Sequence, residues 1–296
     1  ALAPALKNAP IPVLTAFWGS TLCGEAGRIL RDNGIPASEY PEQAAIMLHH
    51  LRHSPRSRAG TAPGPDGPTR RRARDLMARV EPGQYLQADQ AYELLKIFGV
   101  RSARGRLVKS AGEARSVPLE YPVAAKIDRP DIAHKASVGG VKLNLADPFE
   151  LGEAVEDLLR TFSGASGVLV QEQVPAGLEL IISSVTDPQL GSGLMVGLGG
   201  VWVEIIKDVV FGYPPLDRAA ALELIDRLKC APLLNGYRSR PGVNKEALAI
   251  MIERISAMLP ALPEIAELDL NPVIYDRAQD AFIAAGVRIK KGGSIQ

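Results

Sequence analysis

The chain contains 296 residues, of which 46% are hydrophobic and 23% are charged. Its 34 basic and 33 acidic side chains leave a formal net charge of +1, which argues against a nucleic-acid-binding protein. No run of residues reaches the roughly 18 to 20 apolar positions of a membrane span, so we expect a cytoplasmic protein of about two domains. The two cysteines, Cys23 and Cys230, are too few for a disulfide framework and are expected to be buried apolar side chains.

Residues 1–53 predict the C-terminal part of an α/β sheet domain. The apolar run IPVLTAFW is followed by an amphipathic helix over residues 23–33, a short strand in GIPAS, and a helix from Pro41 to about Leu51. Two strands bury too little surface to stand alone, so further strands are expected upstream or in a partner. Because the chain starts without methionine just before a buried strand, we expect it to be a fragment of a longer protein.

Residues 54–83 are predicted to form a linker, since Pro, Gly and Arg are abundant and apolar residues follow no period before Leu76. The basic run from Arg70 to Arg74 has the composition of a nucleic-acid patch. No aromatic residue alternates with it, however, so a solvated face of the linker is the favoured interpretation.

Residues 84–296 predict an α+β domain of antiparallel strands and interleaved helices. Helices are expected over residues 88–98, 148–161, 217–229 and 244–259. Strands are expected near Leu107 and over residues 121–127, 141–145, 168–173, 178–186, 194–198, 201–206, 267–270 and 281–284. No segment repeats at a fixed period, which excludes a solenoid.

Three features of this domain suit a nucleotide. Lys126 ends the apolar strand YPVAAK, where a packed stem and a free ammonium group suit polyphosphate oxygens, although such lysines are also common for structural reasons. The buried strand VLVQEQ runs into a segment whose main chain can pair with a purine edge, and Glu179 follows within reach of ribose hydroxyls. Gly199 and Gly200 let main-chain amides approach an anion, although a glycine hairpin turn has the same composition.

The motif ELDLNP suits a divalent cation. Strand alternation puts Glu267, Asp269 and Asn271 on one face, spaced by about 7 Å. Carboxylate and amide oxygens of this kind are suitable ligands for Mg²⁺. The alternative is the polar face of an edge strand.

The loop HKASVGG places His134 and Lys135 before two glycines, just after the strand that ends at Lys126. An imidazole can accept a phosphoryl group, and a nearby ammonium group with glycine amides would stabilise the phosphoryl charge. A surface histidine beside a glycine turn is the alternative. The phosphoryl role of this loop is what the family resemblance given next implies.

In their order along the chain, these motifs resemble the ATP-grasp part of the ADP-forming acyl-CoA synthetases, relatives of succinyl-CoA synthetase. The motifs are YPVAAK, the HKxxxGGV loop, VLVQEQ with GLE, GLGGVWVEIIKD, LLNGYR and ELDLNP, and the resemblance covers residues 84–289. The segment before residue 53 resembles the end of the flavodoxin-like domain that precedes this part in the family. The resemblance implies an α/β and α+β protein whose C-terminal ATP-grasp domain, residues 84–296, has two subdomains.

The resemblance also implies roles for individual residues. It assigns the nucleotide to Lys126 for phosphates, to Glu172, Gln173 and Val174 for adenine, and to Glu179 for ribose. It assigns Mg²⁺ to Asp269 and Asn271, and makes His134 a second phosphoryl acceptor or relay beside Lys135. Glu204 and Asp208 match acidic positions that support the metal or the histidine.

The implied reaction joins an acid, CoA and ATP to give acyl-CoA, ADP and phosphate through a phosphohistidine. The CoA-binding domain and the principal phosphohistidine belong to upstream domains, in the same chain or in a separate subunit. CoA would therefore bind only through those domains, ATP or ADP with Mg²⁺ would bind here, and the protein is expected to be an oligomer.

Three positions depart from the family pattern. Ser137 replaces an acid in the HK loop, Gly212 stands where an arginine is usual, and Gly286 stands where an acidic magnesium ligand is usual. Asp276 and Asp280 could replace that ligand, but their polar turn favours exposure to solvent. The departures support a degenerate ATP-grasp module with a regulatory or scaffolding role as the alternative. An ATP-grasp carboxylate–amine ligase is a third hypothesis, which the HK loop disfavours because such ligases need no phosphohistidine.

Overall fold

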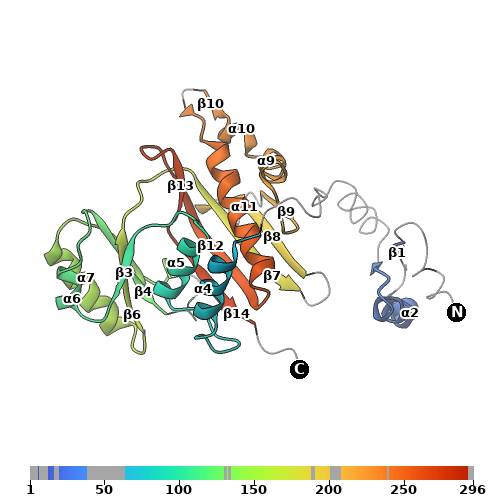
Figure 1. Ribbon diagram of the computed structural model, residues 1–296, viewed down its shortest axis with the longest axis horizontal. Coiled ribbons are helices and arrows are strands. Elements are labelled where there is room, and N and C mark those ends of the chain that lie inside the picture. Colours follow the sequence, from blue (N-terminus) through green and yellow to red (C-terminus); the bar gives the residue numbers. More distant parts are fainter. Residues whose placement is uncertain are drawn as a thin grey trace. The chain divides into compact units, whose positions relative to one another are not determined.

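A computed structural model describes residues 6, 13–16, 20–38, 64–129, 132, 135–187, 191–200, 208–238 and 240–292, to which the structural statements below refer. The chain divides into two compact units, Ala1–Arg56 and Ser57–Gln296 (Figure 1). Among the described residues, no helix is both long and apolar enough to cross a membrane.

The first unit contains a strand, a helix and a second strand in the predicted order. Strands β1 (Thr15–Ala16) and β2 (Ala37–Ser38) pair in parallel, and helix α2 (Ser20–Asp32) connects them. A helical connection is what parallel neighbours require. The predicted helix from Pro41 lies outside the described residues, and so does the side chain of Cys23.

The second unit begins with a helix in the segment that was predicted as a linker. Helix α4 (Gly67–Met77) is capped by Asp66, whose side chain accepts from the Thr69 amide at 2.8 Å. Ala73 and Met77, four residues apart, are fully buried, while the arginines around them are exposed. The linker prediction is wrong here because three core-contacting positions, Leu76 included, give too weak a period in one short helix to be recognised. The predicted exposure of the arginine run is confirmed.

A small four-stranded antiparallel sheet has the order β3-β6-β4-β5. Its strands are β3 (Gly105–Val108), β4 (Val123–Asp128), β5 (Val141–Leu145) and β6 (Gly167–Glu172). Helices α6 (Ala111–Arg115) and α7 (Pro148–Thr161) cover one face of it (Figure 1). Val123, Ala125 and Ile127 face these helices, so strand alternation turns Ala124 and Lys126 to the opposite, inner face.

The larger sheet has the order β13-β12-β7-β8-β9, and β14 also pairs with β12. Its strands are β7 (Glu179–Asp187), β8 (Gly191–Leu198), β9 (Val209–Gly212), β12 (Ile265–Asp276), β13 (Ala281–Ala284) and β14 (Arg288–Lys291). Strand β12 extends past the predicted end at Leu270, with a register shift before Val273 that accommodates Pro272, which has no N–H to donate. The strand predicted over residues 201–206 lies outside the described residues.

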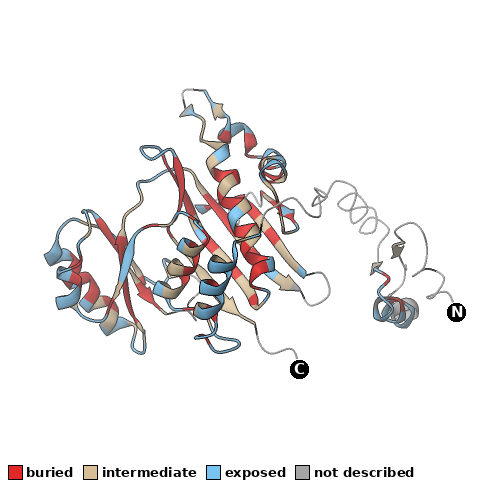
Figure 2. Ribbon diagram, in the orientation of Figure 1, coloured by how far each residue is buried: buried red, intermediate tan, exposed pale blue. Residues whose placement is uncertain are grey.

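The main hydrophobic core joins one face of the larger sheet to the remaining helices (Figure 2). The sheet contributes alternate residues such as Leu180, Ile182, Leu268 and Leu270. The helices are α4, α5 (Ala88–Ile97), α9 (Arg218–Asp226), α10 (Ala231–Leu234) and α11 (Lys245–Ala261), and a short hairpin, β10 (Gly236–Tyr237) and β11 (Arg240–Pro241), follows α10. Cys230 is buried in this core, as predicted, and burial raises the pKa of its thiol to about 12.

Candidate nucleotide site

Two strand faces carry most of the predicted residues. On the inner face of the small sheet, Lys126 and Gln171 are neighbours, because Gln171 pairs with Ala124 and residues two apart in a strand share a face. On the larger sheet, Asp269 of β12 shares a face with its register partner Ser183 of β7. This second surface, here called the polar face, is opposite to the core and is formed by Ser183, Glu267, Asp269, Arg288 and Lys290.

Lys126 is bound to a main-chain carbonyl group. Its Nζ donates to the carbonyl oxygen of Ala285 at 2.7 Å, and the same oxygen accepts from the Tyr92 hydroxyl at 2.7 Å and from the Gln171 amide at 3.2 Å. The prediction of a free ammonium group is therefore wrong, because alternation turns this side chain toward the rest of the unit and not toward solvent. Burial, with a smaller effect from the charge of Lys135, lowers the pKa of Lys126 to about 8.

The loop after β4 is described only in part. His134 lies outside the described residues, whereas Lys135 is described and acts electrostatically on Lys126. The Gly140 amide donates to the Lys135 carbonyl oxygen at 2.7 Å, and the Gly140 carbonyl accepts from the Ile127 amide at 2.9 Å. A Cβ atom at Gly140 would lie 2.9 Å from Ile127 Cγ2, so glycine is needed for the loop to return closely along β4.

The three residues predicted to meet adenine use their side chains within the protein. Glu172 forms an ion pair with Arg104, and Gln173 exchanges two hydrogen bonds of 2.6 Å with Asn144. Val174 packs against a small cluster of buried apolar side chains. Within the described residues, however, the main-chain groups of Gln173 and Val174 have no hydrogen-bond partner. The main chain, and not the side chains, is therefore the candidate contact for a base at this position.

Glu179, Gly199 and Gly200 lie together at the start of β7. The Gly199 amide donates to the Glu179 carbonyl oxygen at 2.8 Å, so the prediction that this amide binds an anion is wrong. A Cβ atom at Gly199 would lie 2.8 Å from the Leu180 carbonyl carbon, and a Cβ atom at Gly200 would lie 2.8 Å from Glu179 Oε2. Gly200 also has a φ of +68°. Both glycines are explained by this close approach to β7.

Alternation along β12 is as predicted, but Glu267 is not available to a metal. Its carboxylate accepts from Lys290 Nζ at 3.0 Å and from the Tyr85 hydroxyl at 3.0 Å. Burial acts to raise the pKa of Glu267, but these two hydrogen bonds and the positive charge of Lys290 outweigh it and lower the pKa. Glu267 is therefore a paired anion of the polar face.

Asp269 and Asn271 keep oxygen atoms for a cation. Ser183 Oγ donates to Asp269 Oδ1 at 2.5 Å, which fixes the carboxylate while no described group binds Oδ2. Asn271 is exposed at the point where β12 shifts register. In the described part of the chain no three His, Cys, Asp or Glu side chains gather into a metal site. Two oxygen ligands fit Mg²⁺, which keeps several waters and is completed by substrate phosphates.

Gly286 is packed against this pair. Its carbonyl oxygen accepts from the Asn271 amide at 3.1 Å, and a Cβ atom at position 286 would collide with the Asn271 carbonyl oxygen. An acid at this position does not fit the observed backbone. Gly212 also faces the packed interior, since a Cβ atom there would lie 2.9 Å from Leu216 Cδ1.

The remaining acidic candidates hold turns. Asp208 is buried and accepts from the Lys229 and Cys230 amides at 2.8 and 2.6 Å, so its predicted support of a metal or histidine is replaced by a capping role. Asp276 is buried, not solvent-facing as expected, and accepts from its own turn. Asp280 is exposed as predicted and accepts from Asn244. Glu204 lies outside the described residues.

Sequence reasoning missed the groups that surround Lys126 and Asp269. Tyr92 on α5 and the main chain of Ala285 carry no motif, and Ser183 is one of several small polar residues in β7. Gln171 did carry a signal, because it interrupts the apolar strand VLVQEQ and is almost fully buried. A buried amide must find partners, so its position marked a polar contact in the interior.

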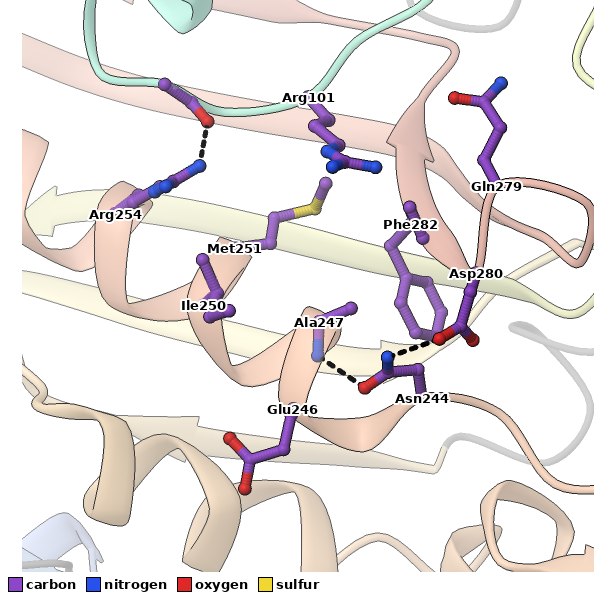
Figure 3. A pocket seen from close by; sticks show the side chains of 12 residues that line it. Arg101, Asn244, Glu246, Ala247, Ile250, Met251, Arg254, Gln279, Asp280 and Phe282 are labelled. Atoms are coloured by element: carbon purple, nitrogen blue, oxygen red, sulfur yellow. Dashed lines mark hydrogen bonds between the residues drawn. The ribbon is translucent and has the colours of Figure 1, made fainter.

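A separate cleft of about 320 Å³ lies between α11 and β13, and of the candidate residues named above only Asp280 lines it (Figure 3). Arg254 donates to the Gly99 carbonyl at one end, and Asn244 donates to Asp280 at 2.7 Å at the other. Its floor is apolar, with Met251 and Phe282. The polar groups at both ends are thus used within the protein.

Comparison with known proteins identifies the larger unit. A family model described as an ATP-grasp domain matches residues 77–290. The β subunit of acetate–CoA ligase (ADP-forming) I from Pyrococcus furiosus is 35% identical over 227 residues, which cover 74% of this chain and 97% of that subunit. Acetate–CoA ligase (ADP-forming) I from Archaeoglobus fulgidus is 33% identical over 279 residues, which cover 90% of this chain but 40% of that relative.

Comparison with solved structures leads to the same family. The dinucleotide-forming acetyl-coenzyme A synthetase 1 of Ca. Korarchaeum cryptofilum, with coenzyme A and Ca-AMPCP, matches at a TM-score of 0.67 and 35% identity, over 75% of this chain and 99% of that one. Its complex with Mg-AMPPCP, in which the phosphohistidine segment points towards the nucleotide binding site, matches at a TM-score of 0.63 and 34% identity, over 74% and 99% of the two chains. The predicted fold class is confirmed, and the chain belongs to the ATP-grasp family as the ATP-grasp part of an ADP-forming acyl-CoA synthetase.

Proposed function

We propose that this chain binds ATP or ADP with Mg²⁺ and transfers the phosphoryl group in the reaction of acid, CoA and ATP to acyl-CoA, ADP and phosphate. One observation supports the proposal most directly. Lys126 donates to the carbonyl of Ala285, and the next residue, Gly286, packs on Asn271 beside Asp269. The phosphate-binding candidate of one sheet and the metal-binding candidates of the other are thus joined through two adjacent residues.

Each of the proposed residues would contact a different part of the nucleotide. The main chain at Gln173 and Val174 would receive the base, and Glu179 at the start of β7 would accept from the ribose hydroxyls. Lys126 would exchange the Ala285 carbonyl for phosphate oxygens, an exchange that favours its charged form. Asp269, oriented by Ser183, and Asn271 would bind Mg²⁺, which would neutralise phosphate charge.

The phosphoryl group would pass through histidine. His134 is the proposed second acceptor or relay, with Lys135 to balance the charge of the phosphoryl group, and Glu204 is kept as its proposed support. Coenzyme A and the principal phosphohistidine would come from other domains. The Pyrococcus furiosus relative is a separate subunit, whereas the Archaeoglobus fulgidus relative is a longer chain, so both arrangements exist among similar proteins. An oligomeric, cytoplasmic assembly is part of this proposal.

Calorimetric titration with Mg-ATP tests the nucleotide site. We expect the wild type to bind, and Lys126→Ala or Asp269→Ala to lose about tenfold or more in affinity, because each removes a charge-assisted contact. Asp269→Ala should also remove the dependence of binding on Mg²⁺. Lys142→Ala is the matched control, since Lys142 lies on the neighbouring strand β5 but pairs with Asp157 at 3.0 Å.

The packing of Gly286 on Asn271 favours a second candidate function, a module that no longer transfers phosphate. Such a module predicts no Mg²⁺-dependent binding of ATP by the wild type, or equal binding by wild type and both variants. Either result would contradict the proposed site. A carboxylate–amine ligase receives no support from the relatives, which are acyl-CoA ligases.

A further inference from the structure

The strand β14 brings a second basic side chain to the polar face. Arg288 is the direct register partner of Asp269, and Lys290 is the partner of Glu267. Directly opposed residues of an antiparallel pair project to the same side of the sheet, whereas Ile289 between them joins the core. Arg288 therefore lies next to the proposed metal ligand, one strand further from β7.

The two basic groups differ in their partners. Lys290 has its charge compensated by Glu267 at 3.0 Å. Arg288 stacks on the ring of Tyr85, with 4.5 Å from its Cζ to the ring centroid, and donates to the Tyr85 hydroxyl at 2.5 Å. Among the described residues no carboxylate lies within ion-pair distance of Arg288, although its charge acts on Glu267, which accepts from the same Tyr85 hydroxyl. The Arg288 Nε is buried without a hydrogen-bond partner.

A guanidinium group held in this way, with no direct ion pair in the described part of the chain, is suited to an oxyanion. The stack on Tyr85 fixes its plane, and a planar guanidinium can offer two parallel donors to one phosphate. A buried donor with no partner is rare in folded proteins and calls for an explanation. A phosphate group beside Asp269 would supply the missing acceptor and an anion in direct contact with the guanidinium group.

The position of Arg288 in the sheet indicates which phosphate of the nucleotide it contacts. Glu179, the proposed ribose contact, and Ser183 are on the same face of β7 and about 13 Å apart along the strand. Asp269 is one strand beyond Ser183, and Arg288 is one strand beyond Asp269. Arg288 is thus further from the ribose end than the proposed metal ligand is. We infer that Arg288 binds the terminal phosphate of ATP, the group that ADP lacks; this rests on the proposed function.

Titration of the full chain with ATP and with ADP, both in Mg²⁺, tests the inference. We expect Arg288→Gln to weaken the binding of ATP about tenfold and the binding of ADP by less than about twofold, because only the contact to the terminal phosphate is lost. Lys290→Gln is the matched control on the same face and strand, and should change the ratio of the two dissociation constants by less than about twofold. Arg288→Lys keeps the charge but not the planar group and should give an intermediate ratio.

Arg288→Lys also serves where Arg288→Gln does not fold, which thermal melting would show. An unchanged ratio in a folded variant, or equal weakening of ATP and ADP, would overturn the assignment of Arg288 to the terminal phosphate while leaving the proposed nucleotide site intact. Failure of the wild type to bind either nucleotide would instead overturn the proposed function, and this inference with it.

Discussion

At the scale of single residues, the site consists of polar groups that differ in whether the protein already uses them. Glu267 is paired with Lys290, and Asp208 caps a turn, so neither is available to a ligand. Asp269 keeps one carboxylate oxygen, and Lys126 is held by a neutral carbonyl that a phosphate can replace. Residue type and motif predicted all four as polar site candidates, but only their partners separate the candidate ligands from the structural groups.

Burial of Lys126 predicts two opposite effects of pH. Its pKa falls from an ordinary value of 10.5 to about 8, so between these values the unfolded chain binds more protons than the folded one. The stability of the nucleotide-free protein should therefore rise with pH through this window. Affinity for ATP should fall as pH rises through about 8, because the neutral amine no longer attracts phosphate.

Both effects can be measured by urea unfolding and by calorimetry from about pH 6.5 to about pH 9.5. Lys126→Gln has no titrating group at this position and should lose both trends. Persistence of either trend in that variant would assign it to another group.

At the scale of elements, strand alternation decides which side chains lie on each face of the two sheets. The small sheet presents an apolar face to α6 and α7 and a polar inner face with Lys126 and Gln171. The larger sheet presents Leu268 and Leu270 to the core and Asp269 to the polar face. Period-2 patterns in the sequence are sufficient to predict these faces. Helix α4 was not predicted, because few of its residues, Ala73, Leu76 and Met77, contact the core.

Helix α4 is expected to contribute directly to stability. Met77 is fully buried in the main core, so Met77→Ala should lower the free energy of unfolding by about 2–5 kcal/mol. Arg71→Ala, on the exposed side of the same helix, should change it by less than about 0.5 kcal/mol. Urea unfolding compares the two variants. Equal effects would mean that α4 does not pack as a part of the core.

At the scale of the whole molecule, the chain matches relatives of different lengths. It spans 40% of the Archaeoglobus fulgidus relative but matches 97% of the Pyrococcus furiosus β subunit. The second relative is a separate subunit, and in the proposed function other domains supply the remaining chemistry. The division of this chain into two compact units, Ala1–Arg56 and Ser57–Gln296, is consistent with such modular construction.

Labelling with the terminal phosphate of ATP tests whether this chain takes part in phosphoryl transfer. After incubation with Mg-ATP labelled in the terminal phosphate, we expect a label on the wild-type chain that is stable in alkali and lost in acid, as a phosphohistidine is. His134→Ala should lose it while keeping ATP affinity within about twofold, since a phosphoryl acceptor need not contribute to binding. Equal labelling of the variant would exclude His134 as the acceptor, and absence of label from a wild type that binds ATP would exclude transfer to this chain alone.

The amino-acid sequence by itself determined the order and type of most elements, the ATP-grasp family and the strand faces that carry the site. These features depend on local periodicity and on motifs in a fixed order, which a single sequence contains. The tertiary structure alone decided that Lys126 donates to the carbonyl oxygen of Ala285, 159 residues away. It also decided that Tyr85 and Lys290 donate hydrogen bonds to the Glu267 carboxylate. Hydrogen-bond partners so distant along the chain meet only because the sheets fold together, and residue spacing carries no record of them.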